Sequence, residues 1–211
     1  PEVRKEVKLC TAVFKLPTEL QKLFERISSL SKIVRVVAYV RRFVEIVKTK
    51  INRKSNEKNT ENKNVSKMQT TALTPAELDE SLKVCVRAVQ KEFFSEEIKH
   101  LSRKNGVLQS SSTIKTLHPF LDEQKILRVG GRLHNSALSF SERFPMLIPS
   151  KHKFTQLLLM QEHRKLLHAP PQMLLSNIRQ TFWPINGLVA AKRIVNNCGL
   201  CARARPKMCV Q

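Results

Sequence analysis

The chain has 211 residues, of which 41% are hydrophobic, enough for one or two domains with a buried core. Its formal charge of +21 lies mainly at the two ends: residues 1–67 carry 17 basic and 7 acidic side chains, residues 68–150 carry 11 and 9, and residues 151–211 carry 10 and 1. No apolar run approaches the roughly 20 residues of a membrane span, no signal peptide is seen, and the five cysteines follow no regular pattern, so we expect neither a membrane partner nor a disulfide framework.

The charge distribution indicates a polyanionic partner. A segment with one acidic residue among eleven charges suits neutralisation of phosphates, whereas a solvated basic surface is the alternative, and an equally good one for residues 1–67. The cysteine usage favours a reducing, intracellular compartment. Because the chain begins with proline and stops ten residues after Cys201, we expect it to be a fragment of a longer protein.

Residues 1–51 are predicted to form an amphipathic helical region. Apolar residues from Leu20 to Leu30 predict one helix, and the serines around Leu30 indicate a kink or restart. The apolar stripe of the following helix advances by steps of three and four: Leu30, Ile33, Val37, Val40, Val44, Val47 and Ile51. A basic amphipathic helix of this kind can lie on a membrane surface or bind a partner's groove, but more often it packs on its own domain.

Residues 52–67 predict a disordered polar linker, because one apolar residue in sixteen cannot offset the entropy of ordering the tract. Residues 68–109 then read as a helical connector. Thr74, Pro75 and Glu77 give the pattern of a capped helix start, and Ser95 is expected to cap a shorter helix that ends near Asn105. Cys85 falls on the apolar face of the first of these helices, so we expect a core residue and not a ligand.

Residues 110–150 are expected to form a small β-ribbon extension. Residues 126–129 and 132–134 predict two strands joined by a two-residue turn at Gly130 and Gly131. Residues 145–149 predict a further short extended piece between two prolines. His134 and His152 lie in predicted loops and are interpreted as bystanders.

Residues 151–211 predict three short helices, at about 151–168, 171–182 and 187–197, separated by prolines. The pair His163 and His168 closes the first helix, and the Cys198-x-x-Cys201 pair follows the third. Two imidazoles and two thiolates are a common ligand set for one structural Zn²⁺. The alternative, surface histidines and core cysteines, suits either pair alone but explains the two pairs together less well.

A catalytic zinc site is not expected here. Nucleobase deaminases place a glutamate two residues after the histidine ligand, but Lys165 and Pro170 occupy the corresponding positions, and Glu162 is the one acidic residue after position 150. A fourth protein ligand also closes the coordination position that catalysis requires. We therefore expect no enzyme activity and no small-molecule substrate.

These motifs resemble those of a known family. The spacing His-x₄-His, the segment Phe182-Trp183-Pro184, and Val195 to Cys201 followed by Arg203, Arg205 and Pro206 resemble the zinc-binding N-terminal domain of retroelement integrases. Residues 119–123, 127–133 and 167–169 are similar to the polyproteins of BEL/Pao-type LTR retrotransposons. The likeness covers roughly residues 18–206 and is strongest over 117–206; Pro170 departs from it, because a glycine is common there.

The resemblance implies a mainly α chain: a helical connector, a small β-ribbon and a zinc-stapled three-helix bundle of the integrase N-terminal type (151–211). It implies a non-catalytic module that supports DNA binding and integrase assembly, with DNA and other integrase subunits as partners. The catalytic carboxylates would belong to a following domain. An active element would place the protein in the nucleus and in cytoplasmic particles.

The expected nucleic-acid contacts are polar and basic residues near the metal ligands. We expect them to contact phosphates before bases: Gln172, Ser176, Arg179, Gln180, Lys192, Arg193, Arg203, Arg205 and Lys207. The alternative function is a zinc-stabilised interaction or oligomerisation module, domesticated or relic, without specific DNA binding.

Overall fold

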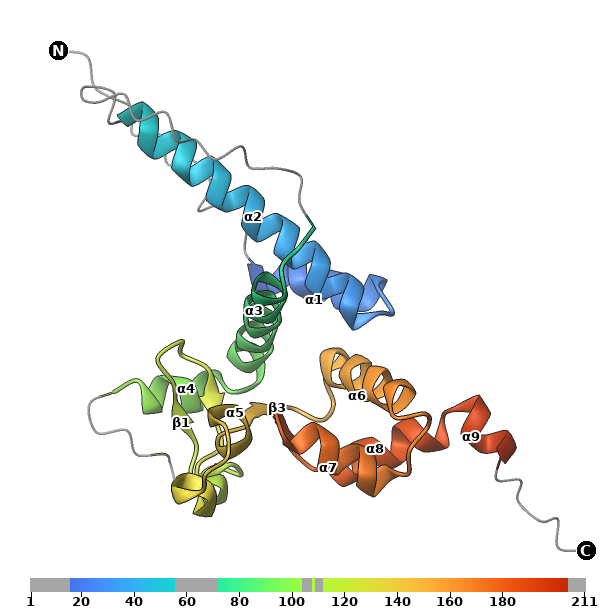
Figure 1. Cartoon of the computed structure of the whole chain (residues 1–211). Coiled ribbons are helices and arrows are strands. Elements are labelled where there is room, and N and C mark those ends of the chain that lie inside the picture. The colour runs from blue at the N-terminus through green and yellow to red at the C-terminus, as the bar shows by residue number, and fades with distance from the viewer. Residues whose placement is uncertain (1–15, 56–71, 104–107, 109–111, 205–211) are drawn as a thin grey trace, which may run out of the picture.

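The computed structural model describes residues 16–55, 72–103, 108 and 112–204, and it is mainly helical with one small sheet (Figure 1). Four helices come first: α1 (Leu16–Arg26), α2 (Leu30–Ser55), α3 (Pro75–Phe93) and α4 (Ser95–Leu101). In the described ranges, no helix combines the length and apolar character that crossing a bilayer requires.

The break between α1 and α2 falls at the predicted serines. Leu30 begins a helix of 26 residues, so the predicted restart is confirmed. This helix continues to Ser55 and therefore includes the first four residues of the predicted polar linker, whereas residues 56–67 lie outside the described residues.

The start of α3 follows from a local capping motif. The hydroxyl of Thr74 accepts a hydrogen bond from the backbone N–H of Glu77, and the Glu77 carboxylate accepts one from the backbone N–H of Thr74. Glu77 also pairs with Arg42 of α2 at 2.7 Å, which ties the capping box to a second helix. The prediction for Ser95 is wrong: Phe94 is the cap residue, and α4 ends at Leu101.

A four-stranded mixed sheet lies between the helices, with the order β1-β2-β3-β4. The first two neighbouring pairs are antiparallel and the pair β3–β4 is parallel. The strands are short: β1 Phe120–Leu121, β2 Leu127–Arg128, β3 Met146–Ile148 and β4 Phe182–Pro184. Strand β4 was expected as the end of a helix, but that helix stops at Arg179 and the chain then pairs with β3.

The predicted hairpin at Gly130 and Gly131 is wrong. The strand before it exists, but residues Arg132–Asn135 form a 3-10 helix, η2. Gly130 instead passes against the chain at His118: its N–H donates to the His118 carbonyl, and a Cβ on Gly130 would lie 2.5 Å from that oxygen. A glycine is thus required at position 130 because the backbone at His118 passes too close for a side chain. The hairpin turn in this region lies between β1 and β2 instead.

Asp122 and Arg128 hold that hairpin together. The Asp122 carboxylate accepts hydrogen bonds from the Ile126 backbone N–H at 2.8 Å and from Arg128 Nε at 2.6 Å. The guanidinium also donates to the Phe144 carbonyl at 2.8 Å and stacks on the Phe140 ring. This buried ion pair is therefore fully supported by hydrogen bonds, the condition under which such a pair is tolerated.

The remaining helical elements surround the end of the sheet. Their bounds are η1 Lys115–Leu117, α5 Phe140–Arg143, α6 Lys153–Lys165, α7 Pro171–Arg179, α8 Gly187–Asn196 and α9 Gly199–Ala204. The three helices predicted for the C-terminal region correspond to α6, α7 and α8. The short α9, which was not predicted, follows them directly and carries the last ligand cysteine.

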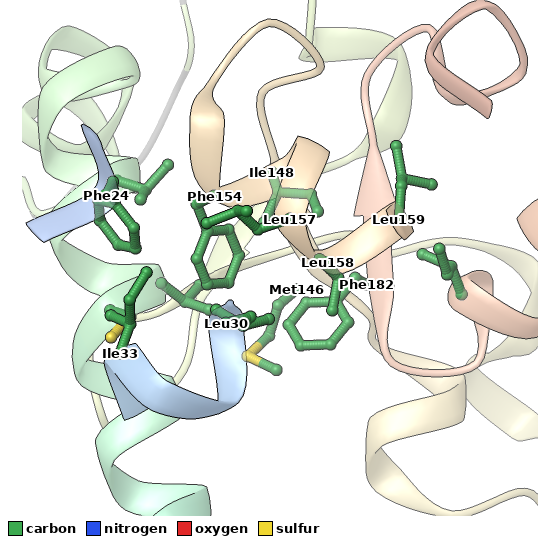
Figure 2. Packing of buried hydrophobic residues seen from close by; sticks show 14 of the residues in the cluster. Phe24, Leu30, Ile33, Met146, Ile148, Phe154, Leu157, Leu158, Leu159 and Phe182 are labelled. Atoms are coloured by element: carbon green, nitrogen blue, oxygen red, sulfur yellow. The ribbon is translucent and has the colours of Figure 1, made fainter. Parts of the chain in front are cut away.

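One large hydrophobic core joins the N-terminal helices to the C-terminal bundle. Figure 2 shows Phe24, Leu30 and Ile33 beside Phe154 of α6, within the same cluster as Ile148 of β3. A second cluster includes Leu127 and Leu147, because successive residues of a strand point to opposite faces of the sheet. The sheet is thus buried on both sides, and the segments predicted as separate regions share one core.

Candidate metal centre

Four side chains from the ends of three helices converge at one point. His163 lies in the last turn of α6, His168 in the turn that follows, Cys198 directly after α8, and Cys201 within α9. His163 and Cys198 are buried, and the other two are half-buried. These are the four residues predicted as ligands, and they come together although 29 residues separate His168 from Cys198.

The turn after α6 adopts an uncommon backbone conformation. Leu167 and His168 have φ values of 50° and 66°, in the left-handed region that non-glycine residues seldom occupy. The N–H of His168 donates to the carbonyl of His163 at 2.8 Å, which closes the helix end. The turn brings the His168 ring against the ring of His163, with the ring centroids 4.7 Å apart.

The four ligand atoms lie close enough to one another to bind a single ion. Nδ1 of His168 lies 3.1 Å from Nε2 of His163, 3.2 Å from Sγ of Cys198 and 3.7 Å from Sγ of Cys201, and the latter lies 3.3 Å from His163 Nε2. All four ligand atoms lie within 4.8 Å of one another. Metal–nitrogen and metal–sulfur bonds of about 2.0–2.3 Å give tetrahedral ligand separations of about 3.3–3.8 Å. The group is compatible with one metal ion.

The local environment favours the protonation states that bind metals. Burial lowers the pKa of His163, and the neighbouring His168 lowers it further. The pKa of the Cys198 thiol is also lowered, chiefly because the backbone N–H of Cys201 donates a hydrogen bond to its sulfur. Neutral imidazole and thiolate are the forms that coordinate a metal, so both shifts act in its favour.

The predicted nucleic-acid contacts lie around the metal centre on the surface. Those within the described residues are all exposed, on α7, α8 and α9 and just after α7: Gln172, Ser176, Arg179, Gln180, Lys192, Arg193 and Arg203. The Arg179 guanidinium stacks on the Trp183 ring, 4.4 Å from its centroid, which holds one of these cations in place. Arg205 and Lys207 lie outside the described residues.

The interpretation of His152 as a bystander is wrong. It is buried, and its Nδ1 accepts a hydrogen bond from the Phe154 N–H at 2.9 Å, so it caps α6. The rings of Phe24 and Phe93 meet its ring edge-on. His152 therefore supports the helix that carries His163, and its position just before an apolar helix was the available signal.

The other single residues are simpler. His134 is exposed, and Cys85 is a fully buried core residue, as predicted, whose thiol has its pKa raised to about 12 by burial. Exposed leucines beside the metal were not predicted: Leu167 is 88% exposed and Leu200 is 53% exposed.

Comparison with known proteins adds no assignment. No family model matches the sequence, and neither a curated protein nor a solved structure matches it. The function must therefore be argued from the residues and their geometry.

Proposed function

We propose that this chain is a zinc-stapled, non-catalytic module of a retroelement integrase polyprotein, of the BEL/Pao type, that supports DNA binding and integrase assembly. The observation that carries the proposal is the convergence of His163, His168, Cys198 and Cys201 within 4.8 Å, next to helices whose exposed residues include Lys192, Arg193 and Arg203. This pairing of a metal staple with a basic surface is what the resemblance of the motifs implies.

The ligand set identifies zinc as the proposed ion. Two thiolates and two imidazoles suit Zn²⁺ in tetrahedral geometry, and four protein ligands leave no open position for a substrate or an activated water. The ion would hold the ends of α6 and α8 together and so fix the surface that α7 and α8 present. A structural role of this kind needs no acidic residue at the site.

The charge near the metal suits a phosphate backbone. Residues 151–211 carry ten basic side chains and one acidic one, and Glu162 already pairs with Lys165 at 2.8 Å. Exposed Lys192, Arg193 and Arg203 follow one another along α8 and α9. Contacts of this type position DNA without reading its sequence.

The test is a DNA titration with the zinc-loaded chain across a range of salt concentrations. If about five phosphate contacts form, log affinity falls with log salt at a slope of about −4 to −5, and chelation of the zinc weakens binding while helical circular dichroism is lost. The variant Lys192→Gln/Arg193→Gln is expected to reduce the slope by about 2. A slope near zero would exclude DNA binding, and an unchanged circular dichroism spectrum in chelator would exclude the zinc staple.

A second function has a specific observation in its favour. The apolar side chains of Leu167 and Leu200 are exposed, and each directly precedes a metal ligand in the sequence, which suits a protein contact better than a phosphate. In this alternative the module mediates oligomerisation without specific DNA binding. Leu167→Ser/Leu200→Ser would then abolish self-association measured by light scattering, while the salt slope in DNA titrations stays near zero.

A further inference from the structure

The outer part of α2 carries exposed and half-buried apolar side chains that belong to neither hydrophobic cluster of the described residues. Positions 36, 39 or 40, 43 and 47 recur at steps of three and four along the helix, so these residues share one side. We call them the outer face: Val36, Tyr39, Val40, Phe43 and Val47. Tyr39 is 55% exposed and Phe43 is 64% exposed, and Figure 1 shows this end of α2 projecting beyond the other helices.

In the outer part of α2, polar residues contact α3 beside the buried Ala38. Arg42 pairs with Glu77, and Arg41 and Glu45 line the same crevice against the first turns of α3. An amphipathic helix that only packs on its own domain turns its apolar side inward. Ile33 and Val37 do so near the start of α2, whereas Tyr39 and Phe43, on another side of the helix, are exposed.

Exposed cations border the outer face. A groove of about 480 Å³ runs between the end of α1 and α2, with Arg26, Lys32 and Arg35 beside the apolar Val36 and Tyr39. All three cations are exposed, and Glu45, the one acidic residue of α2, lies on the opposite side toward α3. A partner on the outer face would therefore meet apolar and positively charged groups together.

These features favour one kind of partner. A second copy of α2 is a poor fit, because the helix carries eight basic residues and one acidic residue, and two such helices would repel each other. The outer face lies on a projecting helix, so a flat anionic surface can reach it (Figure 1). Apolar and aromatic residues on one side with Lys and Arg along its edge are typical of helices that lie in a lipid interface.

We propose that α2 lies along the surface of a bilayer containing anionic phospholipids, with the outer face at the acyl boundary and Arg26, Lys32 and Arg35 at the headgroups. The helix would lie on the membrane and not cross it. The sequence led us to expect no membrane partner because no segment is long enough to span one. The proposal departs from that expectation, and it rests on the exposure of Tyr39 and Phe43 in the structure.

Flotation of the full chain with vesicles tests the proposal. We expect binding to phosphatidylcholine vesicles with about 30 mol% phosphatidylserine and little binding to phosphatidylcholine alone. Tyr39→Ser/Phe43→Ser is expected to lower the partition coefficient at least about tenfold, because the aromatic area that enters the interface is lost. Replacing Arg26, Lys32 and Arg35 with Gln is expected to lower it about a hundredfold.

The controls distinguish insertion of apolar side chains into the bilayer from electrostatic attraction to the headgroups alone. Val189→Ser removes an equally exposed apolar side chain on α8 and should leave vesicle binding unchanged. The emission of Phe43→Trp should shift to shorter wavelength with anionic vesicles, whereas that of Val189→Trp should not. No binding to anionic vesicles would overturn the proposal, as would Tyr39→Ser/Phe43→Ser binding like the parent. A dimer that this double variant disrupts, without vesicle binding, would assign the outer face to a second copy.

Discussion

At the scale of single residues, the metal centre depends on side chains that are costly to misplace. Each of the four ligand atoms lies within 4.8 Å of the other three, so an apolar side chain in place of one of them leaves the ion one ligand short. We expect Cys198→Ala to lose stoichiometric zinc, because three protein ligands hold a structural ion much less tightly than four. Zinc content by native mass spectrometry measures this.

Cys85→Ala is the matched control, because Cys85 is buried in the core of α3, away from the ligand group. It should keep one zinc per chain and lose stability only through the small cavity it leaves. If Cys198→Ala retained full zinc occupancy, the four-ligand site would be wrong.

Gln90 is a second residue with a large expected effect. Its buried side-chain amide donates to the carbonyls of Leu127 and Leu147 at 2.8 and 2.7 Å and accepts from the Leu127 N–H at 2.8 Å, so it joins α3 to two strands. Gln90→Leu leaves three buried backbone groups without this partner and should destabilise the fold by about 3 kcal/mol. Urea denaturation measures the change.

Exposed Gln124, whose side-chain amide donates a hydrogen bond to Glu80 of α3 at 3.4 Å, serves as the comparison for Gln90. Gln124→Leu should change the stability by less than about 0.5 kcal/mol. Equal effects of the two substitutions would show that the Gln90 hydrogen bonds contribute little.

At the scale of elements, the start of α3 combines a cap with a link to α2. The hydrogen bond from Arg42, followed by the bond from the Thr74 backbone, lowers the pKa of Glu77 from its usual 4.5 to about 2. The folded state therefore prefers the carboxylate, so its contribution is complete above about pH 4.5 and is lost as the pH falls toward about 2. Glu77→Gln should therefore reduce the change in melting temperature with pH between about pH 2 and pH 4.5.

Two variants calibrate that prediction. Thr74→Ala removes the hydroxyl cap and should cost about 1 kcal/mol at neutral pH, since it leaves a backbone donor of the first turn unsatisfied. Glu96→Gln alters another carboxylate with a lowered pKa, which pairs with Lys99 at the protein surface, and should have a smaller effect. An unchanged pH profile in Glu77→Gln would count against the capping box as the source.

At the scale of the whole molecule, the shared core predicts that distant segments unfold together. Phe24 of α1 is 2% exposed and packs against His152 and Phe154, so Phe24→Ala should cost about 3–5 kcal/mol. The C-terminal bundle should melt in the same transition, which the single tryptophan, Trp183 in β4, reports by fluorescence.

Circular dichroism follows all the helices at once, so the two probes should give the same midpoint in the parent and shift together in Phe24→Ala. Phe43→Ala, on the exposed outer face, is the control and should leave both midpoints in place. If the midpoint of the Trp183 fluorescence transition were the same in Phe24→Ala as in the parent, the bundle would be an independent folding unit.

The sequence by itself determined the features that depend on local spacing. The ligand residues His163, His168, Cys198 and Cys201 were found because helix ends and Cys-x-x-Cys spacing are short-range patterns, and so were the α2 restart and the capping box at Thr74. Only the tertiary structure decided that Phe182 to Pro184 pair with β3, that Gly130 passes a backbone carbonyl, and that Tyr39 and Phe43 of α2 are exposed. Strand pairing and the direction of a helix face depend on neighbours far along the chain, which a local pattern does not encode.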